Sequence, residues 1–395
     1  MASHDHSEKN MKIGVIGVGR LGICFALLLD RAGHDVMASD IRTNYVAALN
    51  RGEIQTTEPD VANLLAHKKS IQFTTNTRAV IQNSDVIYVM VATPSAADGS
   101  YDISAVYRVV EDILECEFDI SGKILVIGCT TNPGDCQRVQ DRVRSQGMSV
   151  LYNPEFIAQG SIIRDLQHAD MVLIGGEDPA VISAYQLLYD DIQTIRPNVH
   201  AMSLTAAELV KIATNCFLTT KISYANMLGE VLIRSGLDDD VDLALAAVGA
   251  DSRIGSKYMR YGFGYGGPCL PRDNRAFAHY AQRVGLDFPL GTIVDEFNRD
   301  HTGFLVQNAI EKNKKSLPFY MAGITYKPHT DIIEESQQHK FLVDLLDLGH
   351  HVFVEPSNLL PISTVQHLLT TYTNLRFMSR QDLTAANIDV FEIYT

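Results

Sequence analysis

The residue with the strongest claim to chemistry is Cys269, because it follows a glycine-rich stretch and precedes two charged residues. Glycines stand at positions 262, 264, 266 and 267, and Arg272 and Asp273 follow the thiol. A nearby cation favours the thiolate, which is the nucleophilic form of cysteine. Because cysteine is more often a buried apolar side chain than a nucleophile, the interpretation of Cys269 as a nucleophile depends on this setting. The other five cysteines lack it, and their spacing indicates neither a zinc site nor a disulfide framework.

A lysine and an asparagine form a second candidate pair. Lys211 and Asn215 are four residues apart in an apolar-rich segment, which predicts one long helix from Ser203 to about Leu237. Residues with this spacing lie on one face of a helix, so both side chains can converge on one reacting oxygen. A lysine in such a helix can instead extend its charge to water.

A third candidate is a turn with the spacing G-x-G-x-x-G. It follows a predicted strand at 11–16, opens a helical stretch at 23–32 and precedes an acid, Asp40. Such a turn brings a pyrophosphate close to the backbone at a helix N-terminus, and the acid accepts hydrogen bonds from ribose hydroxyls. The acid favours NAD over NADP, although Arg42 could weaken that preference. The residues assigned to this dinucleotide site are Gly17, Val18, Gly19, Arg20, Leu21, Gly22, Asp40, Ile41 and Arg42.

The elements around these residues predict an α/β protein. Further strands are expected at 35–39, 85–92 and 123–129, and their alternation with helical patterns predicts a doubly wound, Rossmann-like parallel sheet. A helical region with almost no strand signal follows, to about Asp300. Strands at 319–324 and 351–354, with a helix between them that ends at Gly349, then predict a smaller Rossmann-like α/β domain. The expected divisions are a disordered leader at 1–10 and domains at 11–202, 203–300 and 301–395.

Composition excludes several classes of protein. The chain has 33 basic and 47 acidic side chains and a formal charge of −14, which repels nucleic acids and anionic membranes. No stretch reaches the roughly 18 apolar residues that a membrane span requires. The leader has no apolar signal-peptide core, and its His4 and His6 indicate a solvated tail rather than a metal site. We therefore expect a cytoplasmic protein without nucleic-acid, membrane or metal partners.

Three longer segments resemble, in the same order, segments of the UDP-glucose and GDP-mannose dehydrogenase family. Residues 153–161 are similar to the family's N-P-E-F-L-x-E-G segment, and 207–226 resemble its central helix. Residues 251–273 resemble the family's segment that ends at a cysteine and an aspartate. The resemblance spans nearly the whole chain. It implies NAD as cofactor, a nucleotide sugar as substrate, a homodimer formed through the central helical domain, and a C-terminal domain that binds the nucleotide sugar.

The resemblance also implies a mechanism. The C6 alcohol of the sugar is oxidised to a carboxylate through a thiohemiacetal and a thioester on Cys269, with two molecules of NAD. Lys211 and Asn215 stabilise negative oxygen, and Glu155 and Asp273 position or deprotonate water. The implied catalytic residues are Cys269, Lys211, Asn215, Asp273, Glu155 and Thr131. Additional cofactor contacts are assigned to Thr93, Pro94, Thr130 and Lys327, and either Thr130 or Thr131 anchors the water or the nicotinamide.

Substrate binding requires local cations, since the net charge of the protein is negative. Arg253, Lys257 and Arg260 precede Cys269, and the resemblance implies that Arg253 reaches the active site of a neighbouring subunit. Residues 323–331 resemble the family's C-terminal G-x-x-Y-K-x-x-x-D segment, whose lysine corresponds to Lys327. The residues assigned to the substrate are Phe156, Ile157, Ala158, Gln159, Arg253, Lys257, Arg260, Phe263, Gly264 and Gly266.

The chain departs from the family pattern at several positions. Gln159 replaces an acid, Arg272 a lysine and Met227 a glutamate, and a C-terminal segment with a further arginine has no counterpart, so we expect a shortened C-terminal domain. UDP-glucose is the preferred substrate on base rates, while UDP-N-acetylhexosamines and GDP-mannose remain alternatives. A two-electron β-hydroxyacid-type dehydrogenase and a non-catalytic nucleotide-sugar-binding homologue also remain open.

Overall fold

The computed structural model describes residues 10–56, 58–287 and 289–393. Apart from Asn10, the leader that we expected to be disordered lies outside these residues, as do His4 and His6. The chain divides into two compact units, residues 1–211 and 212–395. Helix α9 (Leu204–Arg234) belongs to both, because the division falls within it.

The first unit is built on an eight-stranded sheet with the order β3-β2-β1-β4-β5-β6-β7-β8. The six strands from β3 to β6 are parallel, whereas β7 pairs antiparallel with β6 and parallel with β8. The order of those six strands is that of a dinucleotide-binding doubly wound fold. The strands are β1 (Lys12–Ile16), β2 (Asp35–Ser39), β3 (Gln72–Thr74), β4 (Val86–Val89), β5 (Ile124–Ile127), β6 (Ser149–Tyr152), β7 (Met171–Gly175) and β8 (Asn198–Met202).

Helices connect these strands in alternation, as expected for parallel pairing. Two of them show why they begin where they do: Asn76 caps α4 by accepting from the amide of Ala79, and Asp178 caps α8 by accepting from Ala180. The helices are α1 (Arg20–Ala32), α2 (Thr43–Arg51), α3 (Val61–Ala66), α4 (Thr77–Asn83), α5 (Ser104–Leu114), α6 (Asp135–Val143), the short η1 (Arg144–Gln146), α7 (Ile162–Gln167) and α8 (Pro179–Asp190).

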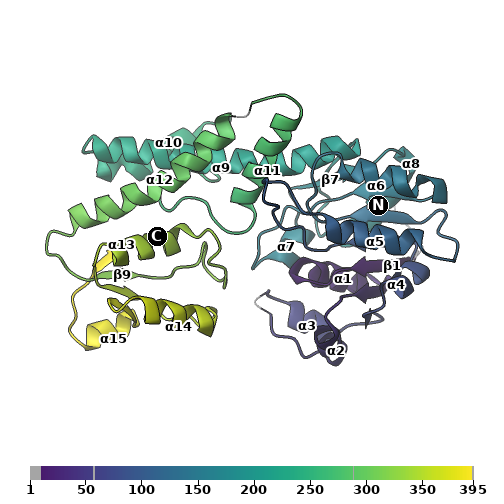
Figure 1. Cartoon of the computed structure of the whole chain (residues 1–395), viewed down its shortest axis with the longest axis horizontal. Helices are drawn as coiled ribbons and strands as arrows, with labels where there is room; N and C mark the ends of the chain where they lie inside the picture. Colours follow the sequence, from purple (N-terminus) through teal and green to yellow (C-terminus); the bar gives the residue numbers. More distant parts are fainter. Residues whose placement is uncertain (1–9, 57, 288, 394–395) are drawn as a thin grey trace, which may run out of the picture. The chain divides into compact units, whose positions relative to one another are not determined.

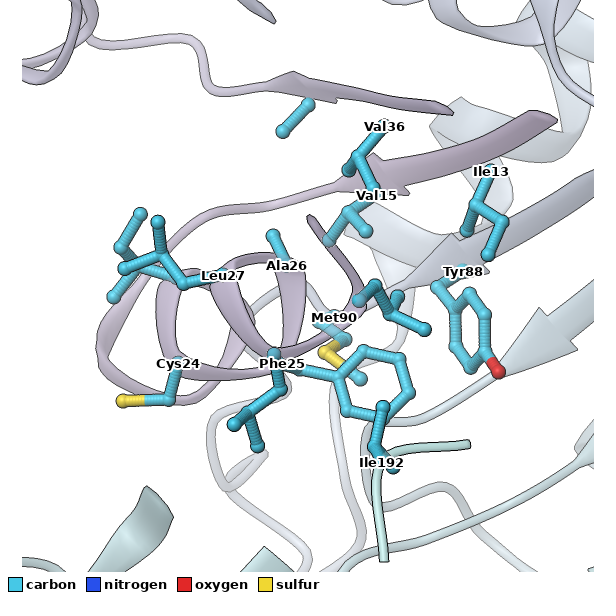
Figure 2. Close-up of a cluster of buried hydrophobic side chains, with 14 of the residues drawn as sticks. Ile13, Val15, Cys24, Phe25, Ala26, Leu27, Val36, Tyr88, Met90 and Ile192 are labelled. Atoms are coloured by element: carbon cyan, nitrogen blue, oxygen red, sulfur yellow. The ribbon is translucent and has the colours of Figure 1, made fainter. Parts of the chain in front are cut away.

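The core of this unit lies between α1 and the centre of the sheet. The run 23–29 in α1 is wholly buried, and it packs on the apolar strands β1 and β4. Figure 2 shows Phe25 reaching from α1 toward Tyr88 of β4, with the two ring centroids 4.6 Å apart. Burial of this apolar surface holds the loop between β1 and α1 in place, because both of its ends are anchored in the core.

The second unit combines long helices with a small parallel sheet of order β11-β10-β9-β12. Figure 1 shows α13 and α14 on either side of the sheet at β9. Phe319 of β9 and Phe341 of α13 lie fully buried at its centre. The elements after α9 are η2 (Asp238–Asp240), α10 (Val241–Ala250), α11 (Leu270–Arg283), α12 (Pro289–Lys312), β9 (Phe319–Met321), α13 (Gln337–Asp347), β10 (Val352–Val354), α14 (Ile362–Thr371), β11 (Leu375–Phe377), α15 (Arg380–Ala385) and β12 (Phe391–Ile393).

The fold class and the strands predicted from sequence are confirmed, with bounds that differ by up to three residues. The residue pattern predicted no bounds for β3, β6, β7, β8, β11 and β12. β3 has only three residues, and β8 is a largely exposed strand with polar residues, so neither shows the apolar run of a buried strand. No helix in the described part of the chain is long and apolar enough to cross a membrane.

Candidate functional site

The candidate residues of the first unit follow the carboxyl ends of parallel strands. The glycine turn follows β1, Thr93 and Pro94 follow β4, Thr130 and Thr131 follow β5, and Glu155 follows β6. Because these four strands are parallel neighbours in the sheet, the loops after them lie along one edge. In open α/β sheets this edge is where ligands bind.

The glycine turn has the form of a pyrophosphate cradle. The amide of Gly17 donates to Ser39 O at 2.8 Å, which ties the turn to the end of β2. A Cβ at Gly22 would collide with Gly17 O, so the turn closes onto α1 only when residue 22 is glycine. A Cβ at Gly19, in contrast, would have no atom within 4 Å. The backbone at Gly19 is therefore open to a phosphate group, and α1 begins at the next residue, Arg20, with its amide donors.

Asp40 is held at the end of β2 by Arg42. The Arg42 side chain donates to both carboxylate oxygens at 2.8 Å, and its guanidinium lies 4.1 Å from the centroid of the Tyr45 ring. Partial burial raises the pKa of Asp40, but hydrogen bonds from Arg42 and from the Val18 amide outweigh it and leave the pKa below its ordinary value. Asp40 is thus an anion suited to ribose hydroxyls, and the neighbouring Ile41 is almost fully exposed.

The loop after β5 is organised by a buried carboxylate on the first turns of α9. Glu208 is inaccessible to solvent and accepts from the Thr131 hydroxyl at 2.7 Å and from the amides of Gly134 and Cys136 at 2.6 and 2.9 Å. It thereby caps α6, for which Gly134 offers no side chain. Thr131 is buried and its hydroxyl donates to Glu208, whereas the adjacent Thr130 is partly exposed. After β4, Thr93 is buried and Pro94 is exposed.

Glu155 lies in an aromatic environment that changes its acidity. The Tyr189 hydroxyl donates to its two carboxylate oxygens, at 3.1 and 3.0 Å. Burial raises the pKa of Glu155 to about 7, against the opposing effects of the Tyr189 hydrogen bond and the Lys211 charge. A carboxylate that titrates near neutral pH can take up and release a proton during a reaction, as a general base must.

Lys211 joins the beginning of α9 to the segment after β6. Its Nζ donates to the backbone oxygen of Glu155 at 2.8 Å and lies 4.6 Å from the centroid of the Phe156 ring. Farther along the segment, Ile157 packs against the core, and Gln159 accepts from the Arg20 side chain at 3.1 Å. The exposed Ala158 donates its amide to Asp165. The structure therefore brings the predicted residues Glu155, Phe156 and Lys211 together.

In the second unit, Cys269 stands at the N-terminus of α11 with an exposed side chain. One helical turn later, Asp273 is buried and accepts a hydrogen bond from the side-chain amide of Asn215 at 2.6 Å. The Nε of Arg272 lies 3.5 Å from the other oxygen of Asp273. The positive end of a helix dipole favours the negative charge of a thiolate. The structure thus brings Asn215, Asp273 and the start of the cysteine helix together.

The glycine loop before Cys269 packs against α12 and the segment before α13. Asn298 accepts from the Tyr265 amide at 3.0 Å and donates to Tyr265 O at 2.9 Å, and a Cβ at Gly264 would collide with its side chain. A Cβ at Gly266 would meet the backbone of Glu335. Phe263 packs edge-on against Phe341. These contacts show why glycine is needed at 264 and 266: the loop backbone lies directly on its neighbours.

The basic residues assigned to the substrate lie on the surface of the second unit. Arg253 is 87% exposed and pairs with Asp251 at 2.6 Å, and Lys257 and Arg260 are also exposed. Lys327 lies in the loop after β9, where its Nζ is 5.6 Å from the centroid of the Tyr326 ring. No group of three or more His, Cys, Asp or Glu side chains among the described residues could hold a metal ion.

Two residues that organise this site, Tyr189 and Glu208, were assigned no role from the sequence. Tyr189 reaches Glu155 from α8, 34 positions away, and no local pattern signals that contact. Glu208 was identified only as part of a motif, although it lies three residues before Lys211 and therefore on the same side of the helix. That spacing could have indicated its role.

Comparisons with known proteins agree with this geometry. The chain matches the NAD binding domain of the UDP-glucose/GDP-mannose dehydrogenase family over residues 11–193 and the central domain of that family over residues 205–300. It is 30% identical, over 91% of its length and 84% of the relative's, to the putative UDP-glucose 6-dehydrogenase YtcA of Bacillus subtilis (strain 168).

Among solved structures, a UDP-glucose dehydrogenase from the archaeon Pyrobaculum islandicum is similar, with a TM-score of 0.83 and 26% identity over 98% of this chain and 91% of that one. A UDP-D-ManNAc dehydrogenase from Pyrococcus horikoshii shares the fold, with a TM-score of 0.74 and 24% identity over 87% of this chain and 83% of that one. The family resemblance and the assignment of NAD are thereby confirmed. The chain belongs to the UDP-glucose/GDP-mannose dehydrogenase family of nucleotide-sugar dehydrogenases and carries that family's NAD-binding domain.

Proposed function

We propose that the protein oxidises the C6 alcohol of a nucleotide sugar, preferentially UDP-glucose, to the carboxylate in a four-electron reaction. One observation carries the proposal. Lys211 and Asn215 occupy successive turns of α9, and each is bonded to a different set of candidate residues: Lys211 to Glu155 O and Asn215 to Asp273. The first set includes a carboxylate that titrates near neutral pH, and the second lies in the first turn of the helix that follows the thiol.

The glycine turn, Asp40, Ile41 and Arg42 would hold NAD, with further contacts from Thr93, Pro94, Thr130 and Lys327. NAD, when bound, accepts a hydride in each of the two oxidation steps. Lys211 and Asn215 supply an ammonium and an amide donor that stabilise negative charge on the substrate oxygen. Glu155 takes up protons, since its pKa of about 7 allows both forms at neutral pH.

Cys269 makes the second oxidation possible. The first step leaves an aldehyde at C6; the thiolate adds to its carbonyl carbon, and the oxygen takes up a proton to give a thiohemiacetal. Loss of that hydroxyl proton and of a hydride from the same carbon gives a thioester. Water, positioned by Glu155, Asp273 and Thr131, attacks the thioester carbon, breaks the carbon–sulfur bond and releases the acid and the thiol.

The substrate preference follows the relatives. YtcA and the Pyrobaculum islandicum protein are both named for UDP-glucose. The substrate contacts that we propose come from 156–159, from the exposed Arg253, Lys257 and Arg260, and from Phe263, Gly264 and Gly266. We propose that the C-terminal domain at 301–395 also binds the nucleotide sugar. Exposed arginine and lysine suit a pyrophosphate, which needs local cations in a protein with a charge of −14.

We propose further that the protein is a homodimer through its central helical region, 203–300. An apolar stripe on α9 supports this. Phe217, Tyr224 and Val231 follow a spacing of seven residues and are 66%, 50% and 54% exposed. Exposed large apolar residues in one row indicate an interface, and a second copy of α9 offers the same row in return. We place the enzyme in the cytoplasm, because a thiol nucleophile must stay reduced.

The proposal is tested by counting NADH per substrate with UDP-glucose, UDP-N-acetylhexosamines and GDP-mannose, each with wild-type protein and with Cys269→Ser. The expected result is two NADH with UDP-glucose in the wild type, and a reaction that stops at the aldehyde or at a stable adduct in the variant. One NADH per substrate would support a two-electron dehydrogenase instead. Tight nucleotide-sugar binding without NADH would indicate a binding protein, and normal acid production by Cys269→Ser would refute the covalent scheme.

A further inference from the structure

A buried histidine in the second unit has both ring nitrogens engaged by acceptors. His301 of α12 is 1% exposed, and its Nδ1 lies 2.6 Å from Glu230 Oε1 of α9. Its Nε2 lies 2.7 Å from Gly262 O. The ring lies nearly parallel to the rings of Phe297 and Phe304, with centroids 5.7 and 6.4 Å away.

This geometry demands two protons on the pair. A backbone carbonyl only accepts, so Nε2 must carry a hydrogen that it donates to Gly262 O. A neutral imidazole has no second N–H, so the proton between Nδ1 and Glu230 must be an additional one, on either partner. Glu230 therefore fixes the orientation of the ring, with Nε2 directed at Gly262 O.

Gly262 is the first residue of the glycine loop that ends at Cys269. Its amide donates to Asn226 Oδ1 of α9 at 3.1 Å, so both of its polar backbone atoms are bound by side chains. Three residues later, Asn298 binds both polar backbone atoms of Tyr265. Four glycines make the intrinsic flexibility of this loop high, so its conformation depends on these side-chain contacts.

We propose that His301 is a positioning residue for the nucleophile: with Glu230, it fixes the start of the glycine loop and through that loop the place of Cys269. The inference rests on the proposed function, because it concerns the thiol that we assign to thioester formation. The pair itself touches neither substrate nor cofactor in this assignment. The pair keeps the glycine loop in one conformation. Without it Cys269 is misplaced, and a misplaced reacting group lowers turnover rather than the affinity for the cofactor.

The test compares three variants with the wild type. His301→Phe keeps an aromatic ring between Phe297 and Phe304 but donates no hydrogen bond, whereas His301→Gln restores donors through its amide. Phe304→Leu is the matched control, because it weakens the packing on the ring and leaves both hydrogen bonds of His301 intact. The readouts are hydrogen–deuterium exchange of residues 261–268, kcat, and the KM for NAD.

In His301→Phe, exchange of the loop amides should accelerate about tenfold, since one buried hydrogen bond is lost. The kcat should fall about tenfold while the KM for NAD changes less than about twofold. His301→Gln should recover most of both effects, and Phe304→Leu should show neither. Loop exchange and kcat like the wild type in His301→Phe would overturn the proposal, and so would equal effects in Phe304→Leu.

If the single variant does not fold because the partly buried Glu230 loses its partner, the double variant His301→Phe/Glu230→Leu removes that carboxylate and leaves only Gly262 O without its donor. The same outcomes then apply to it. Cys269→Ser separates the two proposals: full acid production by that variant would refute the proposed function, while loop exchange would still report whether His301 holds the loop.

Discussion

Removal of the Tyr189 hydroxyl tests whether Glu155 is the group that limits the reaction at low pH. The hydroxyl donates to both carboxylate oxygens and thereby stabilises the anion. Tyr189→Phe keeps the ring, which lies 6.2 Å from that of Phe25 and is otherwise buried. The variant therefore removes one interaction with the charged form of Glu155 and little else.

The size of the effect follows from the lost hydrogen bond. A hydrogen bond to a charged group contributes about 1.5–3 kcal/mol, and about 1.4 kcal/mol corresponds to one pH unit. Burial already raises the pKa of Glu155 to about 7. Loss of the hydroxyl should raise it further, so the acid limb of the pH profile should move up by about one pH unit.

The assay is kcat/KM for the nucleotide sugar, measured between pH 5.5 and 9.5, because this ratio reports the titration of the free enzyme. The wild type should lose activity below about pH 7 and Tyr189→Phe below about pH 8. Tyr185→Phe is the matched control, since Tyr185 donates to Asn153 and not to Glu155. An acid limb that stays in place in Tyr189→Phe, or that moves equally in Tyr185→Phe, would refute the assignment of Glu155.

Three further predictions concern stability, cofactor binding and assembly. Because the pKa of Glu155 is raised in the folded state from 4.5 to about 7, its contribution to stability is fully present below pH 4.5 and is lost as the pH rises to about 7. In urea titrations, the free energy of unfolding of the wild type relative to Glu155→Gln should therefore fall by about 3 kcal/mol across this range. A difference that does not change with pH would contradict the buried carboxylate. Gly22→Ala should lower the free energy of unfolding by several kcal/mol, because its Cβ collides with Gly17 O. Gly19→Ala should leave stability unchanged and weaken NAD binding at least about tenfold, as measured by calorimetry. Equal stability losses in the two variants would show that the cradle is not open at Gly19. Tyr224→Glu, at the centre of the exposed α9 stripe, should shift the protein from dimer to monomer in analytical ultracentrifugation, because a dimer would bury the new charge, and an unchanged dimer would place the interface elsewhere.

The sequence determined the elements that form from local pattern. Apolar runs and the strand–glycine–helix order predicted β1, α1 and the dinucleotide turn, because a buried parallel strand and a phosphate-binding turn each have a short, contiguous signature. The spacing of Lys211 and Asn215 predicted that they share one face of one helix, since helical periodicity needs no tertiary information. The proposal for Cys269 likewise rests on its neighbours in the chain.

Only the tertiary structure decided how those residues are held. Burial raises the pKa of Glu155, and the hydrogen bond from Tyr189 of α8 opposes that shift; both arise only when distant segments pack together. The sequence alone does not show that Thr131 is buried, with its hydroxyl bound to Glu208 of α9. His301 shows no motif at all, and its contact with Gly262 joins residues 39 positions apart. Burial and long-range hydrogen bonds set protonation and orientation, and neither can be read from the order of residues, because both depend on which distant segments pack together.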